Sequence, residues 1–397
     1  MNKMSHPLTP FTFPLFLLLS LLLASCRTGD EPTIPSQVEH VGTGVHIPSA
    51  DTAAIRGFYL LNEGNMGSNK CTLDYYDALT GNYHRNIYGE ANPDVVHELG
   101  DMGNDLQVYD GKLWAVINQS NLVEVMDAAT ARHITQLSIP NCRHITFHDR
   151  YAYVSSFAGP VDIDPTSQLG YVARIDIDRM TIVDTCVVGY QPEELVVHDD
   201  HLYVANSGGY RYPNYDRTVS VIDLSTFTVT DTIDVAINLH SLQVDPQGYI
   251  WVSSLGDYYT ISPKTYVVDP TTRRVCDSLD IVNSSMAMAG DSLYIYGAEW
   301  SYAANGWVIT YHLVDTRTRE VIADHFITDG TEQQIVMPYA VAVNPTTREL
   351  YITDAGDFIA PGKVYCFTPE GQLQWKATTG NTPSRIAFTS IPHIFSK

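Results

Sequence analysis

The sequence predicts an all-β protein, a seven-bladed β-propeller with four antiparallel strands in each blade and a ring that the C-terminal strand closes by joining blade one. Two observations lead to this prediction. A unit in which an aromatic residue stands among aliphatic ones occurs seven times, with its aromatic residue at positions 59, 114, 153, 203, 251, 294 and 351. The mean spacing is about 49 residues, and each unit holds short apolar runs separated by polar turns, which is the pattern of a propeller blade.

We name the strands of a blade A to D from the axis outward. The aromatic run is strand B, and in six units a short run before it supplies strand A, at residues 106–108, 145–147, 195–197, 242–244, 286–288 and 341–343. A third strand follows, as at 219–223, and a fourth completes the unit after a polar turn, as at 229–233. The first unit has no preceding run, and residues 385–388 near the C-terminus fit that pattern instead. Pairing of this run with blade one would leave no open edge in the ring.

Four segments are expected along the chain. Residues 1–25 are predicted to be a lipoprotein signal peptide, because the apolar run at 13–24 is too short to span a bilayer comfortably. Residues 26–55 are expected to be a lipidated Cys and a flexible tether, since residues 27–55 contain no Phe, Trp or Tyr. The propeller is expected over 56–389 and a C-terminal tail over 390–397.

The end of the apolar run carries the lipidation prediction. Leu23-Ala24-Ser25-Cys26 resembles the bacterial lipoprotein cleavage box, in which the Cys becomes the new N-terminus and carries the lipid. An ordinary signal peptide followed by a chance Cys is the alternative. Asp30 and Glu31 resemble the acidic surface-export signal of Bacteroidetes lipoproteins.

Composition excludes some partners and sites. The chain has 397 residues, with 23 Lys and Arg against 45 Asp and Glu, so its formal net charge is −22. Because phosphate neutralisation needs clustered basic side chains and no basic run is present, nucleic acid is not expected as a partner. Five Cys besides Cys26 form no Cys-x-x-Cys pair. Their positions predict buried free thiols rather than a metal site.

One face of the predicted ring is the candidate binding surface. The loops between strands B and C are long and rich in Tyr, Trp and Asn, whereas the A–B and C–D turns are short. These long loops open on the same face as the connections from strand D to the next strand A, which makes this face the candidate surface. The candidate ligand-binding residues on this face are Asn62, Glu63, Asn65, Asn104, Arg143, Glu193, Asn206, Tyr210, Tyr212, Tyr215, His240, Asp257, Tyr258, Tyr259, Glu299, Trp300, Tyr302, Asp354, Asp357, Phe358 and Arg385. All the aromatic members except Phe358 cluster in blades four to six, and packing between neighbouring blades is the alternative interpretation of them.

Motifs of common enzymes are missing from the sequence, which holds no G-x-S-x-G, no H-E-x-x-H and no glycine-rich phosphate loop. We therefore predict no enzymatic activity, no cofactor and no metal. Residues 198–201 are expected to be a turn on the opposite face, and Asp162 with Asp164 could join a calcium site only if further ligands were present. Glu193 and Glu194 could form an acid–base pair near the axis, they could be solvated at the rim, or they could hydrogen-bond to an adjacent blade.

Several short motifs carry a resemblance to a known family. Together with the cleavage box, residues 62–65, 72–77, 343–345, 351–355 and 362–365 resemble a Bacteroidetes family of surface lipoproteins with a seven-bladed, YVTN-like propeller. That family includes proteins that capture a cobamide (vitamin B12) and partner TonB-dependent transporters.

The resemblance implies a role at the cell surface. It implies a small-molecule ligand, a cobamide, that the protein passes to an outer-membrane TonB-dependent transporter. It also implies a lipid anchor in the outer membrane as the only membrane contact. A glycan- or peptide-binding surface propeller is the alternative function, and a propeller lyase or lactonase is a third.

Overall fold

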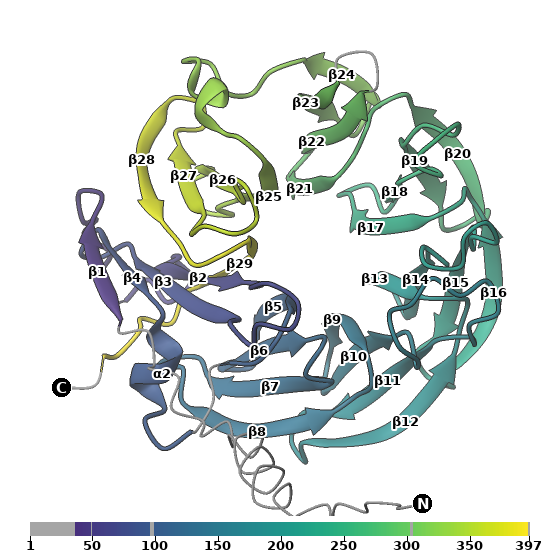
Figure 1. Cartoon of the computed structure of the whole chain (residues 1–397), viewed down its shortest axis with the longest axis horizontal. Coiled ribbons are helices and arrows are strands. Elements are labelled where there is room, and N and C mark those ends of the chain that lie inside the picture. Colours follow the sequence, from purple (N-terminus) through teal and green to yellow (C-terminus); the bar gives the residue numbers. More distant parts are fainter. Residues whose placement is uncertain (1–35, 49, 96–98, 302–304, 396–397) are drawn as a thin grey trace, which may run out of the picture. The chain divides into compact units, whose positions relative to one another are not determined.

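Seven antiparallel sheets stand around a central axis in the computed structural model of the protein (Figure 1), which describes residues 36–48, 50–95, 99–301 and 305–395. The prediction of an all-β propeller with seven blades is confirmed. The predicted signal peptide and Cys26 lie outside the described residues. Among the residues described, no helix has the length and apolar character needed to cross a membrane.

Each blade follows the predicted A-to-D order. The A strands of blades one to seven are β29 (Pro383–Thr389), β5 (Gly103–Tyr109), β9 (Cys142–His148), β13 (Pro192–His198), β17 (Leu239–Val244), β21 (Ser285–Ala289) and β25 (Pro338–Val343). The B strands are β2 (Gly57–Asn62), β6 (Lys112–Ile117), β10 (Tyr151–Ser156), β14 (His201–Asn206), β18 (Ile250–Ser254), β22 (Ser292–Ser301) and β26 (Leu350–Asp354).

The outer half of each blade consists of strands C and D. The C strands are β3 (Thr72–Asp77), β7 (Leu122–Asp127), β11 (Tyr171–Asp176), β15 (Thr218–Asp223), β19 (Lys264–Asp269), β23 (Gly306–Asp315) and β27 (Lys363–Phe367). The D strands are β4 (Asn82–Arg85), β8 (His133–Ser138), β12 (Thr181–Val187), β16 (Thr228–Asp234), β20 (Arg274–Leu279), β24 (Glu320–Ala323) and β28 (Leu373–Thr378). Two short helical segments, α2 (Ile87–Ala91) and η1 (Thr331–Gln334), lie in connections between blades.

The repeated aromatic residue of strand B belongs to the packing between blades. Trp114 of blade two is fully buried and meets Phe147 of blade three edge-on, with ring centroids 5.4 Å apart. The same cluster joins Val116 to Ile145 and Val154. Each blade presents apolar side chains to its neighbours, so a single blade would leave them in water. Only a complete ring of similar units buries these side chains in every blade, which explains why the unit recurs.

Blade one is completed by both ends of the propeller sequence, as predicted. Strand β29 pairs with β2 in antiparallel register, with Phe58 opposite Phe388 and Leu60 opposite Ile386. In Figure 1 this yellow strand lies beside the purple strands of blade one. The pairing provides β2 with its inner neighbour and closes the ring.

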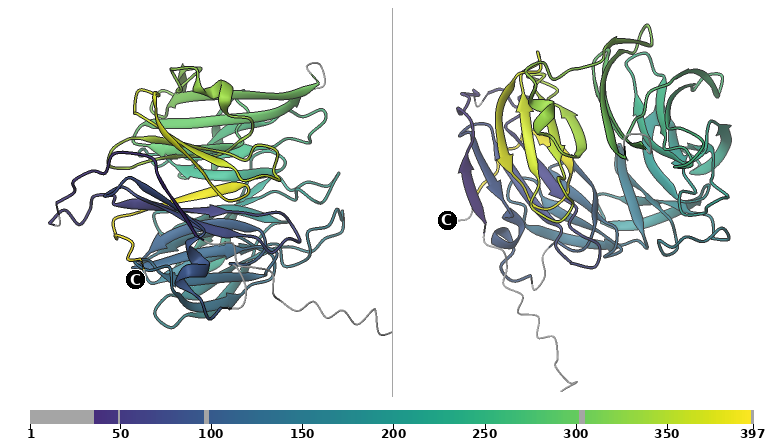
Figure 2. Two further views of the ribbon diagram at one scale, coloured as in Figure 1. Left: turned by 60° about the vertical axis from the view of Figure 1, so that its left-hand side comes forward. Right: turned by 45° about the horizontal axis from the view of Figure 1, so that its top comes forward.

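The predicted flexible tether is wrong for the part that the structure describes. Strand β1 (Gln37–His40) pairs with β4 as a fifth, outermost strand of blade one (Figures 1 and 2). Beyond it, Val45 N–H donates to the Ala78 carbonyl at 2.9 Å. The absence of aromatic residues did not prevent this pairing, because an edge strand offers unpaired backbone groups to any extended segment.

The C-terminal segment after β29 packs against blade one. The ring of Phe395 stacks on His84 with centroids 4.0 Å apart, and His393 Nδ1 lies 2.7 Å from Tyr59 Oη. Of the five described cysteines, Cys71, Cys142, Cys186 and Cys366 are buried as predicted, and Cys142, Cys186 and Cys366 are free thiols, whereas Cys276 is exposed. Cys276 lies on β20, an outer D strand.

Candidate functional site

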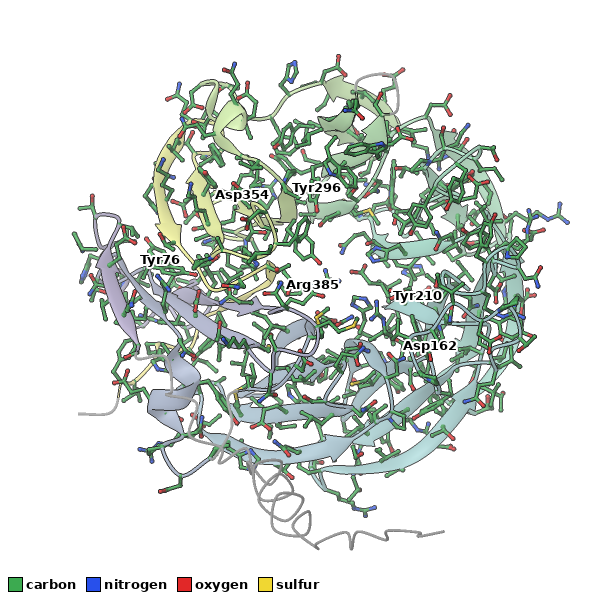
Figure 3. The ribbon with its side chains drawn as sticks, viewed as in Figure 1. Tyr76, Asp162, Tyr210, Tyr296, Asp354 and Arg385 are labelled. Carbon is green, nitrogen blue, oxygen red and sulfur yellow. The ribbon has the colours of Figure 1, made fainter. Side chains whose placement is uncertain are left out.

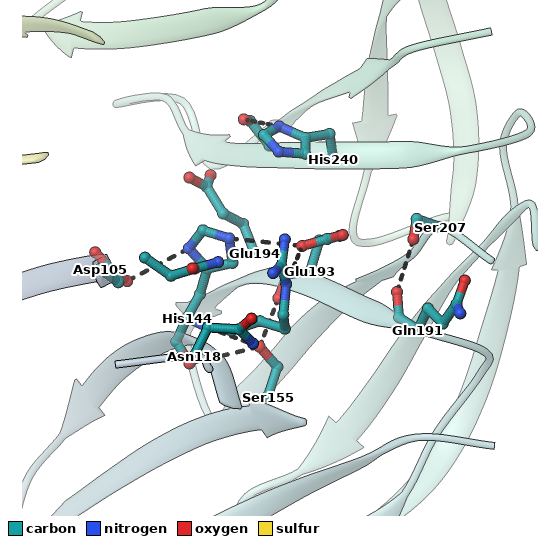
Figure 4. A network of polar contacts seen from close by, with 12 residues as sticks. Asp105, Asn118, His144, Ser155, Gln191, Glu193, Glu194, Ser207 and His240 are labelled. Atoms are coloured by element: carbon teal, nitrogen blue, oxygen red, sulfur yellow. Dashed lines mark hydrogen bonds and ion pairs between the residues drawn. The ribbon is translucent and has the colours of Figure 1, made fainter. Parts of the chain in front are cut away.

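The first residues of the A strands bring charged side chains together at the axis, on the face where the B–C loops emerge. This axial cluster consists of Asp105, Arg143, His144, Glu193, Glu194 and Arg385. Figure 3 places Arg385 at the centre of the ring, and Figure 4 shows several of the other members. The cluster draws on blades one to four, because each A strand begins at the same depth of the ring.

Two arginines neutralise the buried carboxylates. Arg143 Nε donates to Glu193 Oε2 at 3.0 Å, and the Arg143 guanidinium also lies 4.7 Å above the ring centroid of Phe157. Arg385 Nη2 donates to Glu194 Oε1, and Arg385 Nε lies 3.6 Å from Asp105 Oδ1. The cluster therefore links blades that are far apart in sequence through charge-assisted contacts.

His144 lies between two of these acids. Its Nδ1 is 3.6 Å from Asp105 Oδ2, and its Nε2 is 3.7 Å from Glu193 Oε2 (Figure 4). Asp105 Oδ2 also accepts the Ile145 backbone N–H at 3.0 Å, and Glu194 Oε2 accepts that of Leu242 at 2.9 Å. Of the three predicted readings of Glu193 and Glu194, the one with hydrogen bonds to adjacent blades is confirmed.

The contacts keep these acids ionised. Burial alone would raise the pKa of Glu193, but the Arg143 guanidinium and the nearby His144 ring outweigh it and lower the pKa to about 2. Burial would also raise the pKa values of Asp105 and Glu194, but the nearby Arg385 guanidinium outweighs burial and lowers both. Groups held charged in ion pairs are poorly suited to exchange protons at neutral pH.

Glu63 differs from the other acids. Burial raises the pKa of its carboxyl, although Tyr339 Oη donates to Oε2 at 2.6 Å. Tyr296 Oη in turn donates to the Tyr339 carbonyl at 2.6 Å. Glu63 therefore holds a proton more readily than Asp105, Glu193 and Glu194, whose pKa values are lowered.

Two cavities adjoin above the axial cluster. The first, the axial cavity, has a volume of about 330 Å³ and is lined by polar groups such as Asn104, Ser284 and Arg385 and by the aromatic Trp307 and Phe358. The second, the tyrosine chamber, has a volume of about 410 Å³ and is lined by Tyr210, Tyr212, Tyr215, Tyr258 and Tyr259. Arg143, His240 and Leu255 line both. Both volumes fall in the range of small-molecule sites.

Most of the aromatic side chains around these cavities are exposed. Tyr258 and Tyr259 are 60% and 69% exposed, Tyr212 is 50% exposed and Tyr210 37%. Trp300 faces Trp307 across the β22–β23 hairpin, with centroids 5.8 Å apart, and both rings are exposed. Their exposure leaves these rings accessible to a ligand, in contrast to the buried aromatic residues of the B strands.

Two loops of the same design present an aromatic residue to the cavities. In blade five, Asp257 Oδ1 accepts the backbone N–H groups of residues 259, 260 and 261, and Tyr258 has a φ of 65°. In blade seven, Asp357 Oδ1 accepts those of residues 359 and 360, and Phe358 has a φ of 64°. This left-handed backbone is unfavourable for bulky residues, so the carboxylates hold strained loops. Asp257 and Asp357 thus contribute to loop shape.

The structure places many predicted site residues at the two cavities. Those that line one or both are Glu63, Asn104, Arg143, Glu193, Tyr210, Tyr212, Tyr215, His240, Tyr258, Tyr259, Phe358 and Arg385. Asn65 lies in a contact between loops, where its Nδ2 donates to the Phe358 carbonyl. Tyr302 lies outside the described residues.

Three candidates are corrected, because Asn62, Asn206 and Asp354 are buried inside blades. Asn62 Nδ2 donates to Thr72 Oγ1, Asn206 Nδ2 donates to Ser220 Oγ, and Asp354 accepts backbone N–H groups, including that of Met337. Each stands at the end of a B strand, where its side chain satisfies neighbouring polar groups.

A predicted loop is also corrected. Glu299 and Trp300 belong to β22, in which they pair with Val308 and Trp307 of β23. Valine and tryptophan favour strands, and here they extend the hairpin of blade six beyond the length of its neighbours.

Sequence reasoning missed Asp105 and His144 as site residues. The signal that could have found them is a polar pair at the start of most A strands, namely 104–105, 143–144, 193–194, 240–241, 284–285 and 384–385. Residues 198–201 form the predicted turn between β13 and β14. Asp164 Oδ1 accepts bonds from Thr166, and the described residues contain no group of three or more His, Cys, Asp or Glu side chains placed to hold a metal ion.

Comparisons with known proteins agree with the fold. A family model described as "Domain of unknown function (DUF5074)" matches residues 56–369. No curated protein matches the chain.

Solved structures with a similar fold have low sequence identity to this chain. A quinonprotein alcohol dehydrogenase-like protein of Bacteroides thetaiotaomicron is 11% identical with a TM-score of 0.54, over 84% of this chain and 78% of that one. Hydrazine synthase of Kuenenia stuttgartiensis is 15% identical with a TM-score of 0.53, over 67% and 76%. The computationally designed protein Ika8 is 13% identical with a TM-score of 0.52, over 88% and 93%. At these identities the likeness shows the fold alone.

Proposed function

The chain belongs to the DUF5074 family, and we propose that it is a non-enzymatic lipoprotein of the cell surface that captures a cobamide (vitamin B12) and delivers it to an outer-membrane TonB-dependent transporter. The observation that carries the proposal is the pair of adjoining cavities at the mouth of the ring, with a polar floor and accessible aromatic walls. Such a combination of apolar area and a few placed polar groups is typical of a small-molecule site.

The chemistry of a cobamide suits this mouth. A corrin ring is a broad apolar plane fringed with amides, and the exposed rings of Tyr212, Tyr258 and Trp300 offer wide and stiff contact area. Asn104 and His240 line the floor and can exchange hydrogen bonds with amides. A cobamide is larger than either cavity, so it would span both and extend over the rim.

Binding is favoured over catalysis by the state of the axial cluster. Glu193, Glu194 and Asp105 are paired with cations and have lowered pKa values. Glu63 has a raised pKa, but its Oε2 already accepts the Tyr339 hydroxyl. Ion pairs of this kind support the shape of a binding floor without supplying a free acid and base.

A glycan ligand is the second candidate, and the tyrosine chamber is the observation that favours it. Five tyrosines line one cavity, and phenol rings stack on sugar faces while their hydroxyls exchange hydrogen bonds. The two candidates make different predictions for the same titration.

We propose that the anchor is a lipid on Cys26 and that the protein stands in the outer membrane facing outward. Replacing Cys26 by Ala should abolish incorporation of labelled fatty acid and release the protein from the membrane fraction. Unchanged labelling in this variant would contradict the anchor but would leave the ligand proposal intact.

Calorimetric titration of the chain from residue 27 onward with cyanocobalamin tests the ligand. Trp300→Ala and Tyr258→Ala should each weaken binding about thirtyfold, since an aromatic anchor that a ligand buries contributes about 2 kcal/mol. His201→Ala, in the turn of the opposite face, is the control and should bind as the parent does. Absence of cobalamin binding together with binding of a glycan from a panel would overturn the cobamide proposal in favour of the second candidate.

A further inference from the structure

A third cavity lies behind the wall of the tyrosine chamber. The side chains of Tyr212, Tyr215 and Tyr259, which we call the tyrosine wall, line both the chamber and this outer cavity of about 390 Å³. Pro213, Ile237 and Ile261 complete its apolar lining. The wall therefore has two accessible sides, and the outer side faces away from the axial cluster residues that line the chamber.

The rings of the tyrosine wall stand at steep angles to one another. Tyr212 meets Tyr215 at 78° and Tyr259 at 61°, and both centroid separations are 6.1 Å. Tyr215 Oη lies 3.5 Å from the Asp257 carbonyl, which joins the blade-four side of the wall to the blade-five loop. Rings set nearly perpendicular present both faces and edges to a small group at their corner, which suits a compact ligand better than a flat one.

The charge at the outer cavity is negative. Asp257 is the one charged residue among those that line it, and none of the described lining residues is basic. Asp257 Oδ1 accepts three backbone N–H groups and Oδ2 accepts the Thr260 hydroxyl at 2.7 Å. Bonds from the Ile261 backbone and the Thr260 side chain hold the pKa of this carboxyl far below its usual range. The carboxylate is therefore charged at any physiological pH.

The tyrosine chamber differs from the outer cavity in its charge, because a basic residue, Arg143, lines the chamber. Aromatic faces carry negative charge density and attract cations, most strongly where water is partly excluded. Three tyrosines and a carboxylate without a basic neighbour in the same cavity form the chemical pattern that recognises an organic cation. The formal net charge of the chain, −22, also attracts cations at long range.

We propose that the outer cavity is a binding site for an alkylammonium group, such as the trimethylammonium head of choline. Methyl groups of the cation would pack on the rings of Tyr212 and Tyr259, with the Asp257 carboxylate as counter-charge. The site shares the tyrosine wall with the proposed cobamide site but lies in a different cavity, and its ligand class goes beyond that function.

The test is a titration of the purified chain with choline, followed by saturation-transfer NMR on the choline methyl protons. The matched ligand is 3,3-dimethyl-1-butanol, which has the shape of choline without its charge. Choline should bind at least about fivefold more tightly than the neutral analogue, since a cation–π contact of about 1 kcal/mol corresponds to that factor. Equal binding of the two would overturn the proposal.

Variants separate the rings from the charge. Tyr259→Leu should weaken choline binding about fivefold, whereas Tyr259→Phe, which keeps the ring, should bind as the parent does. Asp257→Asn keeps an oxygen for the loop bonds and should weaken choline binding, while Asp199→Asn in the turn of the opposite face removes the same charge elsewhere and should not. Equal loss in Asp257→Asn and Asp199→Asn would overturn the local role of the carboxylate. The choline titration contains no cobalamin. Failure of the choline proposal and failure of the cobamide proposal are therefore seen in different experiments.

Discussion

Replacement of Arg385 by Met tests how much the axial cluster stabilises the ring. Arg385 Nη2 donates to Glu194, its Nε lies 3.6 Å from Asp105, and the side chains of the two acids are only 11% and 7% exposed. Methionine keeps much of the volume but leaves two buried carboxylates without their counter-ion. Removing one partner of a buried ion pair costs about 3–5 kcal/mol, because the remaining charge stays desolvated.

The expected change in melting temperature follows from the size of the protein. An unfolding entropy of about 2.1 cal/mol/K per residue gives about 0.74 kcal/mol/K for the 353 residues described. R385M should therefore melt about 4–7 °C below the parent in calorimetry at pH 7. Arg385→Lys keeps the positive charge and should lose less, and the double variant R385M with Glu194→Gln should recover part of the loss.

The pH dependence of R385M provides an independent check. In the parent, burial alone would raise the pKa values of Glu194 and Asp105, but Arg385 outweighs burial and lowers both. Their contribution to stability is therefore full above the ordinary carboxyl pKa and is lost as the pH falls through the lowered folded values. Without Arg385, burial favours the protonated acids, so the difference between variant and parent should shrink from pH 7 to pH 4. A variant that melts within 1 °C of the parent, or a difference that does not change with pH, would refute this account.

Three further predictions concern the rest of the ring. Deleting residues 381–397 removes β29 and exposes the ladder groups of β2, so the truncated chain should aggregate or melt many degrees lower; an unchanged melting curve would mean that the ring does not depend on this closure. Trp114→Ala should destabilise the ring by about 3–5 kcal/mol in urea titration, because the side chain is fully buried between blades two and three. Burial lowers the pKa of His393 from its ordinary 6.5 to about 4, so its contribution to stability should be lost as the pH falls from about 6.5 to about 4, and His393→Gln should flatten that part of the pH–stability curve.

Repetition made the fold predictable. One aromatic residue among aliphatic ones identifies each B strand, and this residue packs against a neighbouring blade, as Trp114 against Phe147 shows. The closing strand was identified because blade one lacked a neighbour that residues 385–388 could supply. The fifth strand β1 was not predictable in the same way, because its four residues are all exposed and its pairing uses backbone groups alone.

The candidate site was only partly predictable, since composition identifies a face but not the direction of each side chain. Asn62 and Asn206 have the residue type of ligand contacts, yet both are buried and bond to hydroxyl groups of their own blades. Asp257 also has that residue type, but its Oδ1 holds a loop. Asp105 and His144 became part of the cluster through contacts between neighbouring blades, from Asp105 to His144 and from His144 to Glu193. Distances of that kind depend on how neighbouring blades are set around the axis, which no local pattern encodes.

Ring closure and assembly of the site are therefore the same event. Arg385 lies on β29, the last strand of the chain, and it meets Glu194, which is 191 residues away in sequence, only when β29 has joined blade one. The floor of the axial cavity is incomplete before that step, because Arg385 lines it and also neutralises two acids of the axial cluster beneath it, Asp105 and Glu194. A chain with an open ring would hold uncompensated carboxylates at the axis, which favour opening further. The charge balance at the site therefore favours the closed ring. A ligand at the mouth that contacts side chains from several blades would also stabilise the closed state, and more so the higher its affinity.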